Sequence, residues 1–244
     1  MKYEVIDERY SSLIQTIRTH FSKATESLYD ARNKLKVLSY LDENIVVKSF
    51  KIPHIINKVA YGFFRDSKAK KSYDNSLKIV EFVPKPIGYA EFTKFGLLYE
   101  SYFLCEKFEY DFTIREPLTQ KGFEAKEAVF KAFALFTYQL HEKGIEHLDY
   151  SPGNILIKKV HDTYEFKIID VNRMNFKMFT KIERLENFAK LWARDEDLTL
   201  IIKAYTKLID FDEKEAIKIT LKASQKHKDK KNLKKRLKGK KVVD

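Results

Sequence analysis

A chain of 244 residues with 44% hydrophobic and 14% aromatic residues can bury the core of one large domain or of two small domains that share a cleft. Its single cysteine, Cys105, cannot form an internal disulfide, which favours a reducing compartment. The N-terminus lacks the apolar core of a signal peptide, and no apolar run approaches the roughly 20 residues of a spanning helix. We therefore expect a cytoplasmic protein, or one bound to a membrane from the cytosol.

The net charge of +12 is concentrated near the C-terminus. Residues 226–241 hold ten Lys or Arg residues against the single acid Asp229, a charge of +9, and the rest of the chain shares +3. Such a segment is often a solvated, flexible end. It also fits attraction to an anionic membrane or to nucleic acid phosphates. Nucleic acid is the least favoured partner, because no aromatic platform for base stacking lies nearby.

The first third of the chain predicts a helix and a hairpin. Apolar residues at helical spacing predict a helix over residues 8–22, and residues 34–41 and 45–50 predict two paired strands. Lys48 lies inside the second strand. It either points outward as an edge charge or faces a cleft and binds ATP phosphates, as the strand lysine of kinases does.

The phosphate-binding alternative requires a helical acid that holds the Lys48 ammonium. Apolar spacing predicts one helix near residues 54–63 and another over residues 67–82. Asp74 lies on the inward side of the second helix, whereas Glu81 is less well placed because it is near the helix end.

The middle of the chain predicts the crossing to a second lobe. Residues 87–92 and 97–105 predict two strands, and residues 106–110 form the expected crossing. A strongly apolar pattern then predicts a helix over residues 123–143, with Gly144 as its C-terminal stop.

This helix leads into residues 147–154, a loop of the form H-x-D-x-x-x-x-N. Asp149 and Asn154 can converge on one point, Asp149 taking a hydroxyl proton and Asn154 giving its side-chain oxygen to a metal. Gly153 is expected to allow a tight bend before the next strand. We interpret His147 as a structural brace of the loop.

A second oxygen ligand is expected at the end of the next hairpin. The apolar strand that starts at Asn154 is followed by a polar break and by residues 164–169, which predict a returning strand that ends on Asp170. Asn154 and Asp170 would then face one cavity, which suits Mg²⁺. This combination predicts a phosphotransferase site rather than a polar turn.

Helices are predicted over residues 177–192, 198–209 and 213–224. The short distance between Asp170 and the first of them leaves little room for the peptide-docking segment of protein kinases. A small or lipid-linked hydroxyl is therefore favoured over a protein as acceptor.

These motifs resemble the lipopolysaccharide kinase family, the kinases of Kdo and inner-core sugars, which are similar in fold to protein kinases. The likeness covers roughly residues 29–211. It is strongest in Ala31-Arg-Asn33, Val46-Val-Lys-Ser-Phe50, Lys68-Ala-Lys-Lys-Ser-Tyr-Asp74, Leu140-His-Glu-Lys-Gly144, His147-Leu-Asp-Tyr-Ser-Pro-Gly-Asn154 and Ile169-Asp-Val-Asn-Arg173.

The resemblance implies an α+β, two-lobed, protein-kinase-like fold. A small, mainly antiparallel-sheet N-lobe with helices is expected over residues 1–105, and a mainly helical C-lobe over residues 106–225. Residues 226–244 are expected to form a flexible basic tail.

The resemblance also implies the roles of the site residues. Asp149 is the base that receives the acceptor's hydroxyl proton, Asn154 and Asp170 hold Mg²⁺, Lys48 contacts the ATP phosphates, and Asp74 pairs with Lys48.

Three departures from protein kinases bear on these roles. The chain has no glycine-rich G-x-G-x-x-G loop, so residues 29–33, with Arg32 toward the phosphates, would have to provide the cover. Asp74 is one methylene shorter than the usual Glu. Val171 and Asn172 replace the Phe and Gly that follow the metal-binding Asp.

The expected function is that of an ATP- and Mg²⁺-dependent kinase for a sugar hydroxyl of Kdo-lipid A or of the lipopolysaccharide inner core. It would act on a lipid-linked acceptor at the inner face of the inner membrane, with the basic tail on the anionic surface. Arg173, Lys177 and Lys181 either face the carboxylate of an acidic sugar or are ordinary surface cations. A kinase for a protein or small molecule, and a kinase-fold binding module with weak or lost turnover, remain alternatives; protein partners are left open.

Overall fold

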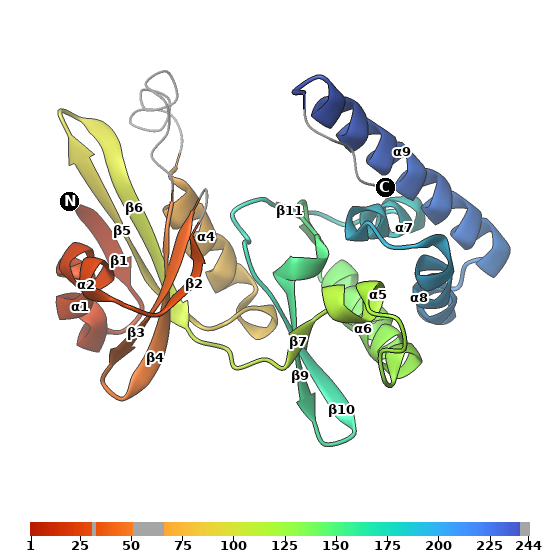
Figure 1. The fold of residues 1–244 in the computed structure, drawn as a ribbon, viewed down its shortest axis with the longest axis horizontal. Helices are drawn as coiled ribbons and strands as arrows, with labels where there is room; N and C mark the ends of the chain where they lie inside the picture. The colour runs from red at the N-terminus through yellow and green to blue at the C-terminus, as the bar shows by residue number, and fades with distance from the viewer. Residues whose placement is uncertain (31–32, 51–65, 240–244) are drawn as a thin grey trace. The chain divides into compact units, whose positions relative to one another are not determined.

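The computed structural model describes residues 1–30, 33–50 and 66–239, which form two compact units (Figure 1). The first unit holds Met1–Glu109 together with Ile168–Arg173, and the second holds Tyr110–Lys167 and the chain from Met174 onward. The segment around Asp170, expected in the C-lobe, thus packs with the first unit. The helix expected near residues 54–63 falls outside the described residues.

The first unit is built on a six-stranded sheet in the order β1-β5-β6-β4-β3-β2, in which the neighbouring strands are antiparallel. The strands are β1 (Lys2–Val5), β2 (Ser27–Asp30), β3 (Lys34–Tyr40), β4 (Glu43–Ser49), β5 (Pro86–Lys94) and β6 (Leu97–Glu106). Strand β4 lies inside the sheet, and Lys48 is opposite Leu35 on one side and Phe103 on the other. Because β4 is not an edge strand, the edge-charge interpretation of Lys48 is wrong.

Helices cover both faces of this sheet (Figure 1). They are α1 (Ser11–Gln15), α2 (Ile17–Lys23) and α4 (Lys68–Lys78), with short 3-10 turns at η1 (Glu8–Tyr10) and η2 (Val80–Phe82). Leu104 packs with the core that includes α1 and α2, whereas its neighbour Phe103 packs with Ala69 and Tyr73 of α4. Since successive strand residues point to opposite faces, α4 lies on the face that carries Lys48.

Two expected helices of the first unit are shorter than the sequence pattern indicates. The helix expected over residues 8–22 is interrupted at Thr16, whose Oγ1 donates to the carbonyl oxygen of Ser12 at 2.6 Å and competes with the helical ladder. Helix α4 begins after Ser67, whose side chain caps Lys70 N at 3.1 Å, and ends at Lys78. Strands β1 and β2 were not predicted from the sequence.

The second unit combines helices with two small sheets, in the orders β10-β9-β7 and β11-β8. Its elements are β7 (Phe112–Thr113), α5 (Arg115–Thr119), α6 (Lys126–Glu142), β8 (Ile145–His147), η3 (Pro152–Asn154), β9 (Ile155–Val160), β10 (Thr163–Ile168), β11 (Met174–Phe176), α7 (Lys181–Asn187), η4 (Phe188–Leu191), α8 (Asp195–Ile209) and α9 (Glu213–Arg236). A buried aromatic cluster around Phe133 and Phe188 fills its core.

The helix boundaries of this unit follow local backbone constraints. Helix α6 begins at Lys126 because Ala125 is left-handed, with φ of 54°. The expected stop at Gly144 is confirmed by its φ of +68°, and an added Cβ would lie 2.8 Å from the carbonyl oxygen of Lys177. Helix α7 begins at Lys181 rather than at Lys177, because Thr180 forms a capping box with Glu183.

Helix α9 extends beyond its predicted end at residue 224 and includes residues 226–236 of the expected tail. Two contacts fix this part of the helix to the unit: Lys228 Nζ donates to the carbonyl oxygen of Ala193 at 2.9 Å, and Lys235 Nζ lies 5.2 Å from the ring centroid of Trp192. None of the helices described is both long enough and apolar enough to span a membrane. The expected α+β class, with an antiparallel sheet in one unit and a mainly helical second unit, is confirmed.

Candidate active site

The catalytic-loop candidate is anchored through the backbone of Asp149. The N–H of Asp149 donates to Nδ1 of His147 at 3.0 Å, which confirms the expected bracing role of this histidine. The carbonyl oxygen of Asp149 accepts from Asn154 Nδ2 at 2.9 Å and from the N–H of Ser151 at 2.7 Å. Both peptide groups beside its Cα are therefore held.

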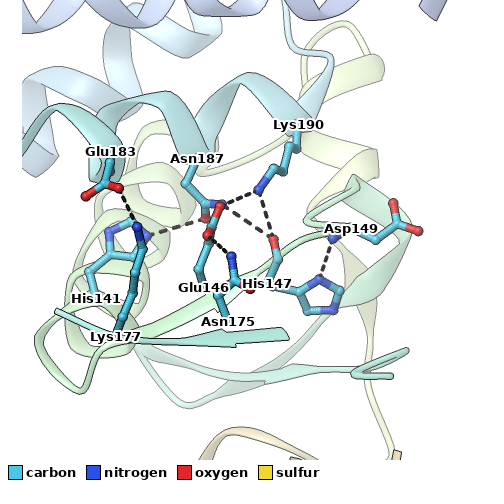
Figure 2. Close-up of polar contacts among 9 residues, drawn as sticks. All are labelled: His141, Glu146, His147, Asp149, Asn175, Lys177, Glu183, Asn187 and Lys190. Atoms are coloured by element: carbon cyan, nitrogen blue, oxygen red, sulfur yellow. Dashed lines mark hydrogen bonds and ion pairs between the residues drawn. The ribbon is translucent and has the colours of Figure 1, made fainter. Parts of the chain in front are cut away.

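The carboxylate of Asp149 has no such partner. Within the described ranges, no hydrogen bond or ion pair reaches it, and the residue is exposed. Figure 2 shows the carboxylate pointing away from the polar contacts that surround His147. The carboxylate is therefore accessible to a hydroxyl that docks from solvent, and a general base must be within hydrogen-bond reach of such a group.

Tyr150 anchors the loop to helix α6, and no sequence pattern predicts this role. The ring is buried and stacks on Phe133, with 5.7 Å between the centroids and 25° between the planes. Its hydroxyl lies 2.9 Å from Thr137 Oγ1 of α6. Burial raises the pKa of Tyr150, so the hydroxyl stays protonated and acts here as a structural group.

Gly153 lies in the 3-10 turn η3, so the expected bend is present, but this bend does not depend on a backbone conformation reserved for glycine. Gly153 is not among the residues with positive φ. Instead, an added Cβ would lie 2.5 Å from Nη2 and 3.2 Å from Cζ of Arg115, so the guanidinium of Arg115 packs directly against the loop. The expected position of Asn154 at the mouth of a strand is confirmed, since β9 starts at Ile155.

Lys48 and Asp170 form an ion pair in the first unit, with 2.7 Å between Nζ and Oδ1. The Lys48 ammonium also lies 5.2 Å from the ring centroid of Phe50. Asn172 donates a short hydrogen bond to the same Asp170 carboxylate, and Asp170 has a left-handed φ of 62°. A non-glycine residue in this conformation is unusual, and it is typical of functional loops.

The expected ion pair between Lys48 and Asp74 is wrong for this structure. Asp74 instead accepts from Lys70 Nζ at 2.6 Å, one helical turn away on the same face of α4. The hydrogen bond that Lys70 donates to Asp74 raises the pKa of Lys70. The short Asp side chain is thus satisfied by its own helix, and Lys48 pairs with Asp170.

The neighbour of Asp74 makes the contact between α4 and the Asp170 segment. Asn75 Nδ2 donates to the carbonyl oxygen of Val171 at 2.7 Å. Nothing in the sequence marks Asn75 for this contact, because a neutral amide carries no charge signal and the neighbouring acid Asp74 is the more obvious candidate.

The two side chains proposed as metal ligands, Asn154 and Asp170, have different partners within the chain. Asn154 uses its Nδ2 to hold Asp149, which leaves Oδ1 as its acceptor atom. Asp170 supplies a carboxylate that is paired with Lys48. A carboxylate and an amide oxygen are each a type of donor that Mg²⁺ accepts in proteins. In the described part of the chain, no group of three or more His, Cys, Asp or Glu residues could hold a metal ion.

The remaining site residue, Arg32, lies outside the described residues, so its role toward phosphates stays a prediction. Of the three cations considered for an acidic sugar, Lys177 pairs with Glu183 at 2.5 Å, and Lys181 donates to the carbonyl oxygen of Asp210 at 2.6 Å. Arg173 is exposed, and within the described ranges its guanidinium has no partner.

Comparison with known proteins identifies the family of this chain. Residues 76–209, which are 134 of the 244, match the model of the lipopolysaccharide kinase (Kdo/WaaP) family. The matched range contains Asp149, Asn154 and Asp170 and begins after Lys48.

Among solved structures, the fold is similar to one described as WaaP in complex with acyl carrier protein. The TM-score is 0.60 and the identity 14%, and the alignment covers 94% of this chain and 99% of that one. Comparison with curated protein sequences finds no match. Because the family model covers more than half of the sequence, this chain belongs to the lipopolysaccharide kinase (Kdo/WaaP) family and is a phosphotransferase of that class.

Proposed function

We propose that this protein is an ATP- and Mg²⁺-dependent kinase that phosphorylates a sugar hydroxyl of Kdo-lipid A or of the lipopolysaccharide inner core. One observation carries the proposal. The Asp149 carboxylate is free and exposed while its backbone is held at the N–H by His147 and at the carbonyl by Asn154, inside the range that matches the family.

In the proposed reaction, Asp149 accepts the proton of the acceptor hydroxyl as the hydroxyl oxygen bonds to the γ-phosphorus of ATP. The bond from that phosphorus to the β–γ bridging oxygen breaks, and ADP leaves with the electron pair. His147 and Asn154 hold the backbone from which the carboxylate projects, so only the Asp149 side chain has to adjust when the hydroxyl docks.

The nucleotide and metal roles are assigned by resemblance. Lys48 would contact the ATP phosphates, and Asn154 and Asp170 would supply side-chain oxygens to Mg²⁺. When bound, Mg²⁺ supplies positive charge to the phosphate oxygens. The ion pair of Lys48 with Asp170 keeps the ammonium on the face of the sheet that α4 covers, instead of at an edge. Asp74 and Arg32 are kept as secondary candidates for the nucleotide site.

The proposed acceptor is a lipid-linked sugar alcohol. Arg173 is the best of the three cations for the carboxylate of an acidic sugar, because Lys177 and Lys181 already have partners within the chain. A guanidinium presents paired donors that match a carboxylate, so Arg173 would read the acid group of the acceptor and leave the reacting hydroxyl to Asp149.

The proposed place of action is the inner face of the inner membrane, with the enzyme bound peripherally. The basic residues of α9 support this, because Lys230, Lys231, Lys234 and Arg236 are exposed on a single helix. Each cation near an anionic surface contributes about 1 kcal/mol. Acyl carrier protein, with which WaaP is in complex in the similar structure, is a second candidate partner, and co-purification from cells that contain both proteins would test it.

The test is transfer of labelled γ-phosphate from ATP to purified Kdo-lipid A and inner-core acceptors, with product masses read by mass spectrometry. The expected product is heavier by one phosphate, and Asp149→Asn is expected to lower the rate about 10²-fold or more. Phosphate found on a protein or a soluble small molecule instead would favour the other kinase alternatives. Nucleotide binding without transfer to any acceptor would favour a binding module.

A further inference from the structure

A polar network contacts the catalytic loop, residues 147–154, through the carbonyl oxygen of His147 (Figure 2). Glu146 of β8 accepts from Lys190 Nζ at 2.7 Å and from Asn175 Nδ2 at 2.9 Å. Lys190 Nζ also donates to the carbonyl oxygen of His147 at 3.4 Å. The proposed transfer assigns no role to Glu146, Lys190 or Asn175.

Asn187 completes the contact with the loop. Its Nδ2 donates to Glu146 Oε1 at 3.3 Å and to the carbonyl oxygen of His147 at 3.4 Å. Its Oδ1 lies 3.4 Å from His141 Nε2, while His141 Nδ1 lies 2.7 Å from the hydroxyl of Tyr205.

The protonation of His141 fixes the orientation of this amide. Burial lowers the pKa of His141 to about 4, so the ring is neutral at neutral pH. A neutral ring that accepts the Tyr205 hydroxyl at Nδ1 donates from Nε2 to Asn187 Oδ1. The amide group of Asn187 is then turned with its Nδ2 toward His147.

We propose that Lys190 is a positioning residue for Asp149. Its ammonium joins the Glu146 carboxylate to the carbonyl oxygen of His147, and the His147 ring in turn accepts the Asp149 N–H at 3.0 Å. This chain of contacts fixes the backbone from which the free Asp149 carboxylate projects. The inference rests on the proposed function, because it assigns Asp149 as the base.

The electrostatics of Glu146 show why a cation is needed at this place. Burial acts to raise the pKa of Glu146, but the hydrogen bonds from Lys190 and Asn175 and the charge of Lys190 outweigh it and hold the pKa below its ordinary value. The side chains of Glu146 and Lys190 are only 18% and 20% exposed. Without Lys190, a largely buried carboxylate would lose its cation and turn toward solvent, which would release the loop.

A second ion pair with little exposure provides a control. Lys126 of α6 pairs with Asp197 of α8 at 2.5 Å, and the side chains are 27% and 2% exposed. Among the residues that the structure describes, no hydrogen bond or ion pair of Lys126 or Asp197 reaches the catalytic loop. Lys126→Met therefore removes a comparable lysine and leaves a buried acid without its cation, so it reports the cost to stability alone.

The experiment compares Lys190→Met, Lys190→Arg and Lys126→Met in the full chain. At a temperature where all variants are folded, we expect Lys190→Met to lower kcat about tenfold or more, with KM for ATP within about threefold of the wild-type value. Lys190→Arg should recover part of kcat, because it keeps the cation. Lys126→Met should lower the melting temperature but leave kcat unchanged.

A second readout needs no acceptor. Amide hydrogen exchange at Asp149 should be about tenfold faster in Lys190→Met than in the wild type, and unchanged in Lys126→Met. If the wild type transfers phosphate to no acceptor, the proposed function fails, while the exchange rate still tests whether Lys190 holds the loop. The inference would be overturned if amide exchange at Asp149 were as slow in Lys190→Met as in the wild type. Equal losses of kcat in Lys190→Met and Lys126→Met would overturn it as well.

Discussion

Lys48 and Asp170 hold each other in an ion pair of 2.7 Å, although one lies in strand β4 and the other in the loop after β10. Only 13% of the Lys48 side chain and 28% of the Asp170 side chain are exposed. The group proposed to bind ATP phosphates is thus paired with the group proposed to hold the metal. Since an ammonium has three N–H donors and a carboxylate has two oxygens, each group can still take a further partner while this pair is kept.

The first prediction concerns Lys48. Lys48→Met should lower kcat/KM for ATP about 10²-fold or more, because it removes the phosphate contact and leaves Asp170 without its cation. Lys48→Arg should not restore the activity, since a planar guanidinium cannot replace a compact ammonium at this place. Steady-state kinetics over a range of ATP concentrations measures both variants.

Lys36 supplies the control for this prediction. Its ammonium donates to the carbonyl oxygens of Phe21 and Ala24 in the same unit, and it has no part in the proposed site. Lys36→Met should change stability but leave the KM for ATP at its wild-type value. Wild-type kinetics in Lys48→Met would refute the assigned role.

The second prediction concerns Asp74. Because Asp74 pairs with Lys70 in this structure, Asp74→Asn should keep activity within about threefold of the wild type. A double-mutant cycle with Lys70→Met should give a coupling of about 0.5 kcal/mol, as for other pairs one turn apart on a helix. A loss of activity as large as that of Lys48→Met would instead show that Asp74 turns to Lys48 when nucleotide binds.

The Asp74 case also shows what the sequence could and could not predict. The hairpin around Lys48, helix α6 and the loop around Asp149 were predictable, because local periodicity and spacing determine them. The partner of a charged side chain, in contrast, is not determined by periodicity or spacing in the nearby sequence. Lys70, one turn away, competes for Asp74, and only the tertiary position of Asp170 decides where the Lys48 ammonium goes.

The polar network of Glu146, Lys190 and Asn187 could not be predicted either, because its residues are distant in the sequence. Glu146 and Lys190 are 44 positions apart in the chain, and neither belongs to a motif. Their contact arises because the 3-10 turn η4 brings Lys190 back to strand β8. Similarly, the motif suggested that Gly153 is needed for its backbone, whereas the side chain of Arg115 occupies the space beside it.

The third prediction follows from that contact. Gly153→Ala should cost less than about 1 kcal/mol of stability, because its Cβ meets the flexible end of Arg115 rather than backbone. Arg115→Ala combined with Gly153→Ala should remove that cost, since the added methyl group then has room. Urea denaturation of the two single variants and the double variant gives the coupling. If the changes in unfolding free energy of the two single variants simply add up in the double variant, the contact between Arg115 and position 153 does not affect stability.

The fourth prediction concerns the basic face of α9. Replacing exposed Lys230, Lys231 and Lys234 with Gln should weaken binding to vesicles with anionic lipids about 10²-fold at low salt, at about 1 kcal/mol per charge. Binding to neutral vesicles should be weak for both proteins. Transfer of phosphate to a soluble acceptor should be unchanged. Equal sedimentation of wild type and variant with anionic vesicles would exclude this face as the membrane contact.

The fifth prediction is a pH dependence of stability that comes from His141. Burial lowers its pKa to about 4 in the folded chain, while a histidine in the unfolded chain titrates near pH 6.5. The fold favours the neutral ring, so this contribution is complete above about pH 6.5, declines as the pH falls, and is lost by about pH 4. The loss should amount to about 3 kcal/mol at the acid end.

Free energies of unfolding measured in urea from pH 7.5 to pH 4 check this value against two variants. His141→Gln removes the titrating ring, so it should be less stable than the wild type at pH 7.5, and the difference should shrink as the pH falls toward 4. His161→Gln, in an exposed turn after β9, should follow the wild-type curve because its ring is not buried. Carboxylates titrate in all three proteins, so only the difference between the curves reports His141. A difference between His141→Gln and the wild type that stays constant over this range would contradict the assignment.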